Sequence, residues 1–376
     1  MTQRSFRGVW MRGGTSKGLL VRTDALPPAG AERDALVLEA MGSPDASQID
    51  GLGGGMSSTS KIILVQLSAR DDCDIDFLFG QVAVRDAVVD WSPNSGNLTS
   101  AVCAYVVDEG MVPVQEPETT FILYNENTRT RIRATVPVSG GRAAVDGDVM
   151  VAGVPRPGAP IVNEYLGLVG SFLQHGPLPT GRPVDVLDTS YGPVEVSFVD
   201  AANLLMFVDA PSLGLRGDEL PARANSDEPL LARVEELRSA GARLLGLVAE
   251  GEDAALASPI LPLPSIVSAP RTFVTTQGDE VHFNDCDLVA RAFSLQRMHH
   301  AHPLTGLICT AVAAVTVGTI PHRLRGDSDD PLRVAVGHPK GVAVGEVKRD
   351  LNGEVESVGV TRTARRLMSG EVWVRG

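Results

Sequence analysis

The chain has 376 residues, and its 33 Lys and Arg against 46 Asp and Glu give a formal net charge of −13. This length suits two domains of ordinary size, and the acidic balance argues against binding nucleic acid or an anionic membrane through bulk electrostatics. An anionic small-molecule substrate would therefore have to be held by local cations and backbone N–H groups.

The first polar segment, residues 12–18, lies between two apolar stretches that are predicted to be strands. Its sequence Arg-Gly-Gly-Thr-Ser-Lys-Gly lacks the longer Gly-to-Gly-Lys spacing of a phosphate-binding P-loop. A Gly-Gly turn rich in cations and hydroxyls is suited to hold a carboxylate, and an ordinary hairpin turn explains the same residues equally well. The candidate binding residues are Arg12, Gly14, Thr15, Ser16 and Lys17.

Residues 31–42 are predicted to form a helix that ends at Gly42. A second polar segment follows at residues 51–61, where three consecutive glycines and then four hydroxyl residues precede Lys61 and an apolar strand. If Lys61 is buried there, its pKa falls and the amine becomes a usable base. The alternative is a lysine at a strand end that reaches back to water. The neighbouring candidates for substrate binding are Ser58, Thr59 and Ser60.

A polar turn at residues 90–97 precedes residues 98–107, which are apolar all round and predict a buried helix. A strand, a tight turn and a buried helix place free N–H groups at the helix start, where they attract anions. We take Asn94, Ser95, Gly96 and Asn97 as candidate site residues. The alternative is that Asn94 or Ser95 only caps the helix.

The rest of the chain shows alternating strand, turn and helix patterns. Strands and turns are predicted from residue 118 to 150, a linker at 177–183, an amphipathic helix at 228–247 and a hairpin at 334–345. Residues 361–370 are predicted to be helical, and residues 371–374 form a final strand that returns to pair within one domain.

The chain also shows an internal duplication. Residues 300–317 repeat the turn-helix plan of the first half, with Thr305-Gly306 matching Ser95-Gly96. Outside this pair, residues 9–21 match 196–208, residues 59–65 match 263–268, and residues 73–79 match 280–284. We therefore predict two similar halves, residues 1–182 and 183–376, with residues 98–107 and 307–317 as equivalent buried helices. Thr305 and Gly306 join the candidate binding residues.

Cofactor and compartment signals are absent from the patterns. Cys73, Cys103, Cys286 and Cys309 have neither CxxC nor metal-ligand spacing, so they are predicted to be small buried side chains. The start of the chain has no apolar targeting core, and no apolar run is long enough to span a membrane. We expect a cytoplasmic protein without a metal site.

Several motifs resemble the PrpF family. They are Met-Arg-Gly-Gly-Thr-Ser-Lys-Gly at 11–18, Gln-Ile-Asp-Gly-Leu-Gly-Gly at 48–54, Ser-Ser-Thr-Ser-Lys at 57–61, Val-Asp-Trp at 89–91 with Asn-Ser-Gly-Asn at 94–97, Val-Asp-Ala-Ala-Asn at 199–203 and Thr-Ala-Arg-Arg-Leu-Met at 363–368. The chain is similar to methylaconitate isomerases, with relatives that include methylitaconate Δ-isomerase and oxalomesaconate tautomerase. The resemblance extends over nearly the whole chain.

The resemblance implies an α+β, diaminopimelate-epimerase-like fold, in which two pseudo-symmetric domains each wrap strands around a central helix. It further implies cofactor-free proton transfer on an unsaturated di- or tricarboxylate. In the family a lysine and a cysteine flank the substrate; the matching positions here are Lys61 and Ser95. A serine hydroxyl does not titrate near neutral pH as a thiol can, so the resemblance leaves both a one-base and a two-base mechanism open for this chain.

These observations lead to one mechanistic prediction and two alternatives. Lys61 is expected to carry an allylic 1,3-proton shift alone, with Ser95 binding a carboxylate or orienting Lys61, and with N–H groups near Gly96, Asn97 and Gly306 holding the negative charge. The alternatives are a Ser-Lys hydrolase that uses Ser58 or Ser95, and a non-catalytic polycarboxylate-binding protein. We expect no nucleic-acid or membrane partner and take a homodimer as the candidate assembly.

Overall fold

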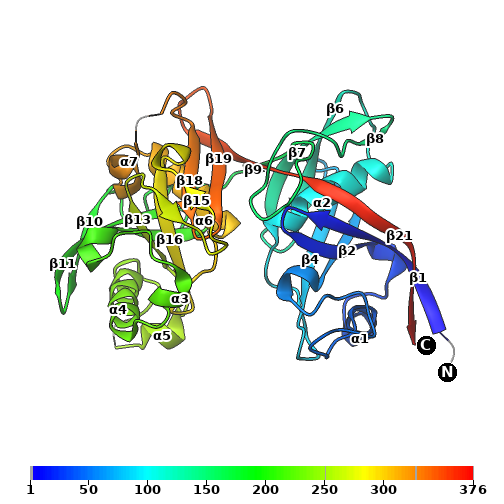
Figure 1. The fold of residues 1–376 in the computed structure, drawn as a ribbon, viewed down its shortest axis with the longest axis horizontal. Helices are drawn as coiled ribbons and strands as arrows, with labels where there is room; N and C mark the ends of the chain where they lie inside the picture. Colours follow the sequence, from blue (N-terminus) through cyan, green and yellow to red (C-terminus); the bar gives the residue numbers. More distant parts are fainter. Residues whose placement is uncertain (1–2, 250, 327, 376) are drawn as a thin grey trace. The chain divides into compact units, whose positions relative to one another are not determined.

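The computed structural model describes residues 3–249, 251–326 and 328–375, and the chain divides into two compact units. Unit 1 comprises residues 1–166 and 360–376, and unit 2 comprises residues 167–359. The first and last strands of the chain therefore belong to the same unit, where they pair along their length (Figure 1).

Unit 1 is built from strands around one long buried helix, with a second helix outside. Short 3₁₀ turns cover Thr23–Ala25 and Ser57–Thr59. The helices are α1 (Ala31–Met41) and α2 (Gly96–Asp108), and the strands are β1 (Gln3–Gly13), β2 (Ser16–Arg22), β3 (Lys61–Leu67), β4 (Ile75–Val82), β5 (Val89–Asp90), β6 (Glu118–Asn125), β7 (Thr130–Ser139), β8 (Arg142–Ala143), β9 (Ile161–Leu166) and β21 (Ala364–Arg375).

Helix α2 is the centre of unit 1. Every residue from Leu98 to Val107 is buried, as a helix without a polar stripe requires. The helix packs against β1, β2, β7, β8, β9 and β21, which surround it in Figure 1. The predicted buried helix at residues 98–107 is confirmed.

Helix α1 covers the sheet of unit 1 from outside. Leu36, Val37 and Met41 belong to one buried apolar cluster that also contains Leu19 of β2 and Val372 of β21. The helix ends as predicted at Gly42, whose φ of 76° lies in the left-handed region and whose N–H bonds back to the last turn. Both α1 and α2 therefore pack against the sheet of unit 1.

Unit 2 has the same kinds of element. Short 3₁₀ turns cover Ala210–Leu213 and Phe283–Asp285. The helices are α3 (Pro221–Ala224), α4 (Glu228–Leu244), α5 (Ala254–Ala257), α6 (Leu304–Val315) and α7 (Ile320–Leu324), and the strands are β10 (Asp185–Thr189), β11 (Gly192–Asp200), β12 (Leu204–Asp209), β13 (Leu263–Ser268), β14 (Phe273–Val274), β15 (Glu280–Val281), β16 (Leu288–Ser294), β17 (Arg297–Met298), β18 (Arg333–His338), β19 (Gly341–Arg349) and β20 (Val355–Arg362), whose end passes into unit 1.

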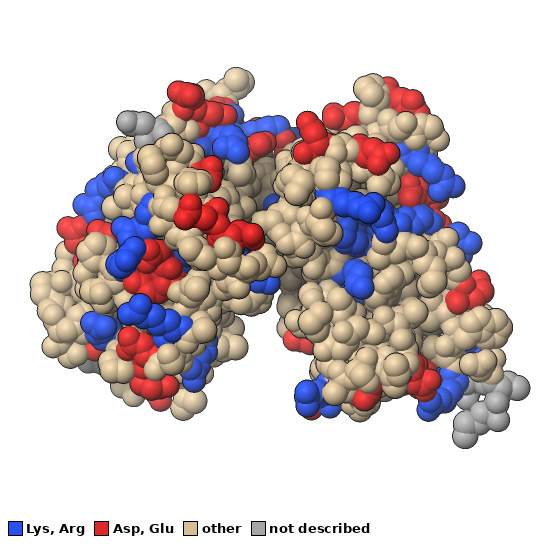
Figure 2. Space-filling model, in the orientation of Figure 1, with Lys and Arg blue, Asp and Glu red and all other residues tan. Residues whose placement is uncertain are grey.

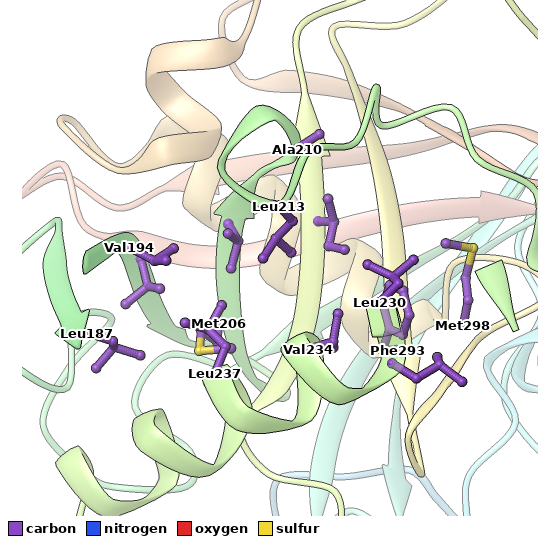
Figure 3. Close-up of a cluster of buried hydrophobic side chains, with 14 of the residues drawn as sticks. Leu187, Val194, Met206, Ala210, Leu213, Leu230, Val234, Leu237, Phe293 and Met298 are labelled. Atoms are coloured by element: carbon purple, nitrogen blue, oxygen red, sulfur yellow. The ribbon is translucent and has the colours of Figure 1, made fainter. Parts of the chain in front are cut away.

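Helix α6 is the buried centre of unit 2, and α4 is its outer helix. Every residue of α6 from Gly306 to Val315 is buried, and the helix packs against β11, β12, β18 and β19. The predicted buried helix at 307–317 is thus confirmed, although it ends at Val315. Figure 3 shows Leu230, Val234 and Leu237 of α4 lying over the sheet in a buried apolar cluster.

Both units pair their strands in the same order and sense. In unit 1 the pairs are β21–β1 and β1–β2 antiparallel, β2–β3 parallel, β3–β4 antiparallel, β4–β6 parallel, and β6–β7 and β7–β9 antiparallel. In unit 2 the pairs are β10–β11 and β11–β12 antiparallel, β12–β13 parallel, β13–β16 antiparallel, β16–β18 parallel, and β18–β19 and β19–β20 antiparallel. The chain is an α+β fold of two pseudo-symmetric units, each with a central helix.

Two sequence predictions are wrong. Residues 361–370 form no helix but extended strand in β20 and β21, since eleven residue pairs join β21 to β1 and this pairing overrides the local helix preference of the Arg-rich segment. The partner of residues 73–79 is β16, which pairs with β13 as β4 pairs with β3; residues 280–284 instead lie in β15 and the following 3₁₀ turn.

Side chains of both charges are interspersed over the visible face of each unit, so the acidic excess is not gathered into one patch there (Figure 2). The four cysteines are buried free thiols, as predicted. Within the described ranges, no helix combines the length and apolar character needed to cross a membrane.

Candidate active site

The turn between β1 and β2 packs directly on the first turn of α2. Gly14 has a φ of +48°, and a Cβ placed on it would lie 2.2 Å from Oδ1 of Asn97. A Cβ on Gly13 would lie 2.4 Å from the carbonyl oxygen of Asn97. Both glycines are therefore required by the close approach of turn and helix. The Asn97 amide also donates to the hydroxyl of exposed Thr15 over 3.0 Å.

Arg12 fastens this turn to the turn between β20 and β21. Its guanidinium donates to the carbonyl oxygen of Thr363 at 2.9 Å, to the hydroxyl of Thr363 at 3.1 Å and to the carbonyl oxygen of Gly14 at 3.1 Å. Burial, with Arg365 nearby, lowers the pKa of Arg12. These bonds give Arg12 a structural role in shaping the turn.

Ser95 occupies the N-cap of α2, but its side chain makes no capping bond. The N–H of Ser95 is bound by the side-chain oxygen of Asn94 at 2.6 Å, and that oxygen also accepts from Asn125 at 2.8 Å. Asn94 thus fixes the entry to the helix. The half-buried Ser95 hydroxyl is left available, beside the N–H groups of Gly96 and Asn97, which have no partner within the helix.

Lys61 begins β3 and is buried, with only 9 % of its surface exposed. Burial disfavours the charged ammonium and lowers the pKa of Lys61 to about 8. Its Nζ lies 4.9 Å from the centre of the Phe79 ring. The alternative of a strand-end lysine reaching water is therefore wrong, because the strand start is covered by its neighbours.

The Lys61 amine has one hydrogen-bond partner among the described side chains, the Oε1 of Gln81 at 2.5 Å. The Gln81 amide nitrogen in turn donates to the carbonyl oxygens of Ser60 at 2.8 Å and Ser57 at 3.1 Å. Gln81 therefore links the amine to the 3₁₀ turn that precedes it.

Gln48 holds the same turn from the other side. It is buried in a left-handed conformation, with a φ of 50°. Its amide donates to the hydroxyl of Ser60 at 2.7 Å and accepts from the N–H of Gly55 at 3.0 Å. A Cβ on Gly53 would overlap the Gln48 side chain, which explains one glycine of the Gly-rich segment. Thr59 bonds back to the carbonyl of Met56.

The lysine segment and the helix terminus meet at Gly18 in β2. A Cβ on Gly18 would lie 2.8 Å from Cδ1 of Leu98 in α2 and 3.0 Å from the carbonyl oxygen of Lys61. Strand β2 therefore lies between the start of β3 and the start of α2, and a bare backbone is needed there. Through Gly18, the hairpin turn, Lys61 and the helix N-terminus belong to one packed region of unit 1.

The start of α6 in unit 2 is arranged differently. Thr305 lies inside the first helical turn and not at the N-cap, which is Pro303. Its hydroxyl accepts from Asn203, in the turn between β11 and β12, at 3.2 Å. Gly306 is buried beside His302, which bonds Thr310 at 3.0 Å and whose pKa is lowered by burial to about 4. Substrate binding by Thr305 and Gly306 stays a prediction.

Most of the predicted residues of the first half lie in this region, but they differ in how exposed they are. Ser16 is buried, Lys17 and Thr15 are exposed, and Ser58 is half-buried. Sequence reasoning missed Gln81, Gln48 and Thr363. Gln48 and Thr363 both stand in motifs already singled out, at residues 48–54 and 363–368, whereas no sequence signal marks Gln81.

The region contains a buried amine, whose pKa of about 8 lies near neutrality, and a helix N-terminus that favours negative charge. Within the described part of the chain, no group of three or more His, Cys, Asp or Glu side chains is arranged to hold a metal ion. The arrangement suits removal of a proton from carbon next to a carboxylate whose charge is met by N–H groups.

Comparison with known proteins shows which family this chain belongs to. The sequence model described as PrpF protein matches residues 3–375. The chain belongs to the PrpF family. It is 39 % identical to the 3-methylitaconate isomerase of Eubacterium barkeri, covering 97 % of this chain and 96 % of that protein. It is 36 % identical to the 2-methyl-aconitate isomerase of Shewanella oneidensis, with the same two coverages.

A solved structure agrees with the sequence relatives. The crystal structure of a methylitaconate-delta-isomerase superposes with a TM-score of 0.91 at 38 % identity, covering 100 % of this chain and 97 % of that one. Since family, relatives and fold coincide over nearly the full length, this PrpF-family chain is an isomerase.

Proposed function

We propose that this PrpF-family protein is a cofactor-independent isomerase that moves a proton between the two allylic carbons of an unsaturated di- or tricarboxylate, such as 2-methylaconitate. The observation that carries the proposal is the buried amine of Lys61, whose pKa of about 8 lies near neutrality. The names of the two relatives support a methyl-substituted unsaturated polycarboxylate as the substrate class.

The first chemical step uses Lys61 as the free amine. With a pKa of about 8, roughly a tenth of the Lys61 side chains are neutral at pH 7. The amine takes a proton from the carbon adjacent to the double bond, so that a C–H bond breaks and an N–H bond forms. The electron pair spreads through the double bond into the carboxylate and gives a dienolate.

The second step returns the proton. The Lys61 ammonium gives it to the other end of the allylic system, which restores the free amine and shifts the double bond. While the intermediate lasts, the former double bond is single, so rotation about it gives cis–trans isomerisation. One group therefore serves as base and then as acid, and no external oxidant, reductant or ion is required.

The start of α2 supplies the charge stabilisation. The N–H groups of Gly96 and Asn97 stand in the first helical turn, where negative charge is favoured. The Ser95 hydroxyl, which caps nothing, donates a hydrogen bond to a substrate carboxylate. Ser95 is assigned no proton-transfer step because a serine hydroxyl does not ionise near neutral pH.

The experiment that tests the function is an NMR assay in D2O with 2-methylaconitate and 3-methylitaconate as probes. We expect double-bond isomerisation together with deuterium uptake at the allylic carbons of at least one probe. Binding without any exchange would identify a polycarboxylate-binding protein instead. Ester turnover that a serine-directed acylating agent blocks would identify a Ser-Lys hydrolase and overturn the proposal.

A further inference from the structure

Gln81 faces Lys61 directly across two neighbouring strands. Lys61 of β3 and Gln81 of β4 are register partners in an antiparallel pair, so their side chains project from the same face. On its other side Gln81 is the register partner of Asp90 in β5. The backbone of Gln81 is paired on both sides and is therefore held in place. Its side chain extends from this backbone towards Lys61.

The hydrogen bonds of Gln81 determine which end of its amide meets the amine. Its Nε2 donates to the carbonyl oxygens of Ser57 and Ser60, which are acceptors only. A flipped amide would place Oε1 against these two oxygens and Nε2 against the amine. Oε1 therefore points at Nζ, where the distance is 2.5 Å.

This acceptor controls both the direction and the charge of the amine. One N–H of Lys61 is committed to Oε1, which turns the lone pair of the neutral amine away from Gln81. Oε1 carries no formal charge, so it stabilises the ammonium far less than a carboxylate at the same place would. Among the described residues no Asp or Glu bridges Lys61, and burial therefore determines its pKa.

We propose that Gln81 is the positioning residue of Lys61: its uncharged Oε1 orients the amine for proton transfer without holding it in the charged form. This inference rests on the proposed function of Lys61 as the base. Gln81 itself takes no proton from the substrate and gives none to it. It acts by keeping the lone pair aimed and the amine able to lose its proton, which an acidic residue at this position would prevent.

The test compares Gln81→Glu with Gln81→Met. The glutamate places a negative charge against Nζ and should raise the pKa of Lys61 by about one to three pH units, moving the rising limb of kcat/KM to higher pH by the same amount. The methionine removes the acceptor, so the limb should move to lower pH. In Gln81→Met the plateau kcat should also fall about 10- to 100-fold with little change in KM, because the amine is no longer oriented for proton transfer.

The matched control is Gln66→Glu, which adds the same charge to β3. Gln66 is five residues from Lys61, about 16 Å along the strand and beyond the reach of a screened charge. Its limb should coincide with that of the unchanged protein. A role of Gln81 confined to holding the turn would lower the midpoint of urea unfolding in both variants without moving their limbs in opposite directions.

A second readout separates this inference from the proposed function. The pH dependence with which acetic anhydride labels Lys61, followed by mass spectrometry, reports the pKa of the amine without any turnover. Opposite shifts for Gln81→Glu and Gln81→Met support the role of Gln81 even if no isomerisation is found. Equal labelling curves in both variants and the unchanged protein would overturn it, even if Lys61 proves to be the base.

Discussion

Each unit buries one cation over a phenylalanine ring, and the two cations are held in different ways. Lys61 in unit 1 lies 4.9 Å from the centre of the Phe79 ring and bonds to the side chain of Gln81. Arg291 in β16 of unit 2 lies 5.0 Å from the centre of the Phe273 ring. Its guanidinium donates to the backbone carbonyl oxygens of residues 219, 290 and 337.

Burial alone does not make a base. Burial lowers both pKa values, to about 8 for Lys61 and to about 10 for Arg291. Arg291 therefore stays charged at neutral pH and serves as a permanent donor to the backbone, whereas Lys61 exchanges its proton there. The strand of unit 2 that corresponds to β3 begins Leu-Pro-Ser and carries no amine. Of these two corresponding strands, only β3 thus begins with an amine.

The largest effect is expected from changing Lys61. Lys61→Arg keeps the positive charge but cannot give a free base at neutral pH, and Lys61→Met removes the charge. Both should lower kcat by about 10⁴-fold or more, the upper end for general-base catalysis, since no second base is proposed. Steady-state assays with the NMR-identified substrate measure this. Near-normal turnover of Lys61→Arg would show that charge, and not proton transfer, is what Lys61 supplies.

The substitution of Arg291 in unit 2 should have the opposite effect, lowering stability and leaving kcat unchanged. Arg291→Lys keeps a cation but replaces a planar guanidinium that reaches several carbonyl oxygens by one compact ammonium. We expect the free energy of unfolding to fall by about 1–3 kcal/mol, because buried carbonyls lose their donors. Urea unfolding measures the loss, and kcat should stay unchanged. A fall in kcat without a loss of stability would contradict a structural role for Arg291.

The free energy of unfolding should also depend on Lys61, with a sign that its lowered pKa fixes. The unfolded chain binds a proton at Lys61 up to pH 10.5, but the folded chain only up to about 8, so a charged, buried Lys61 destabilises the fold below pH 8. Lys61→Met should therefore raise the free energy of unfolding at pH 7 by about 1–3 kcal/mol.

This gain should shrink between pH 8 and pH 10.5, because the unfolded state binds more protons than the folded state in this range and the unchanged protein therefore gains stability as the pH rises. Urea unfolding of both proteins across that range measures it. A loss of stability in Lys61→Met at pH 7 would mean that the amine is a structural tie rather than a strained base.

Much of this region could be predicted from the sequence, because its signals are local. The all-apolar runs at 98–107 and 307–317 give two buried helices, and the echo of one half in the other gives the repeated strand order. Lys61 is recognisable because a cation precedes an apolar strand. The packing around Lys61 sets its pKa, and the residues next to it in the sequence do not reveal this packing.

The remaining features depend on contacts between distant segments. Gln81 meets Lys61 only through the register of β3 and β4, and Thr363 meets Arg12 across 351 residues of sequence. The Arg-rich segment after Thr363 has helical preferences of its own and becomes a strand because β1 offers it an edge. Pairing of this kind is decided by the whole sheet, so local patterns cannot reveal it.

A smaller effect is expected at Ser95. Ser95→Ala should cost roughly one charge-assisted hydrogen bond, on the order of 1.5–3 kcal/mol or about 10- to 150-fold in kcat/KM. Ser95→Cys should be tolerated or faster, because it recreates the residue implied by the family resemblance. Since the hydroxyl makes no capping bond, neither change should move the urea midpoint. A Ser95→Ala variant as inactive as Lys61→Met would assign the second proton transfer to Ser95.

In the proposed mechanism, Lys61 alone carries the proton from one allylic carbon to the other. The most direct test follows a substrate that is deuterated at its reacting carbon, in H2O, and measures the deuterium recovered at the product carbon. A single amine on one face should deliver part of the label internally, and Lys61→Met should show neither transfer nor wash-out. Complete loss of label to solvent in every turnover, or continued exchange in Lys61→Met, would contradict the one-base account.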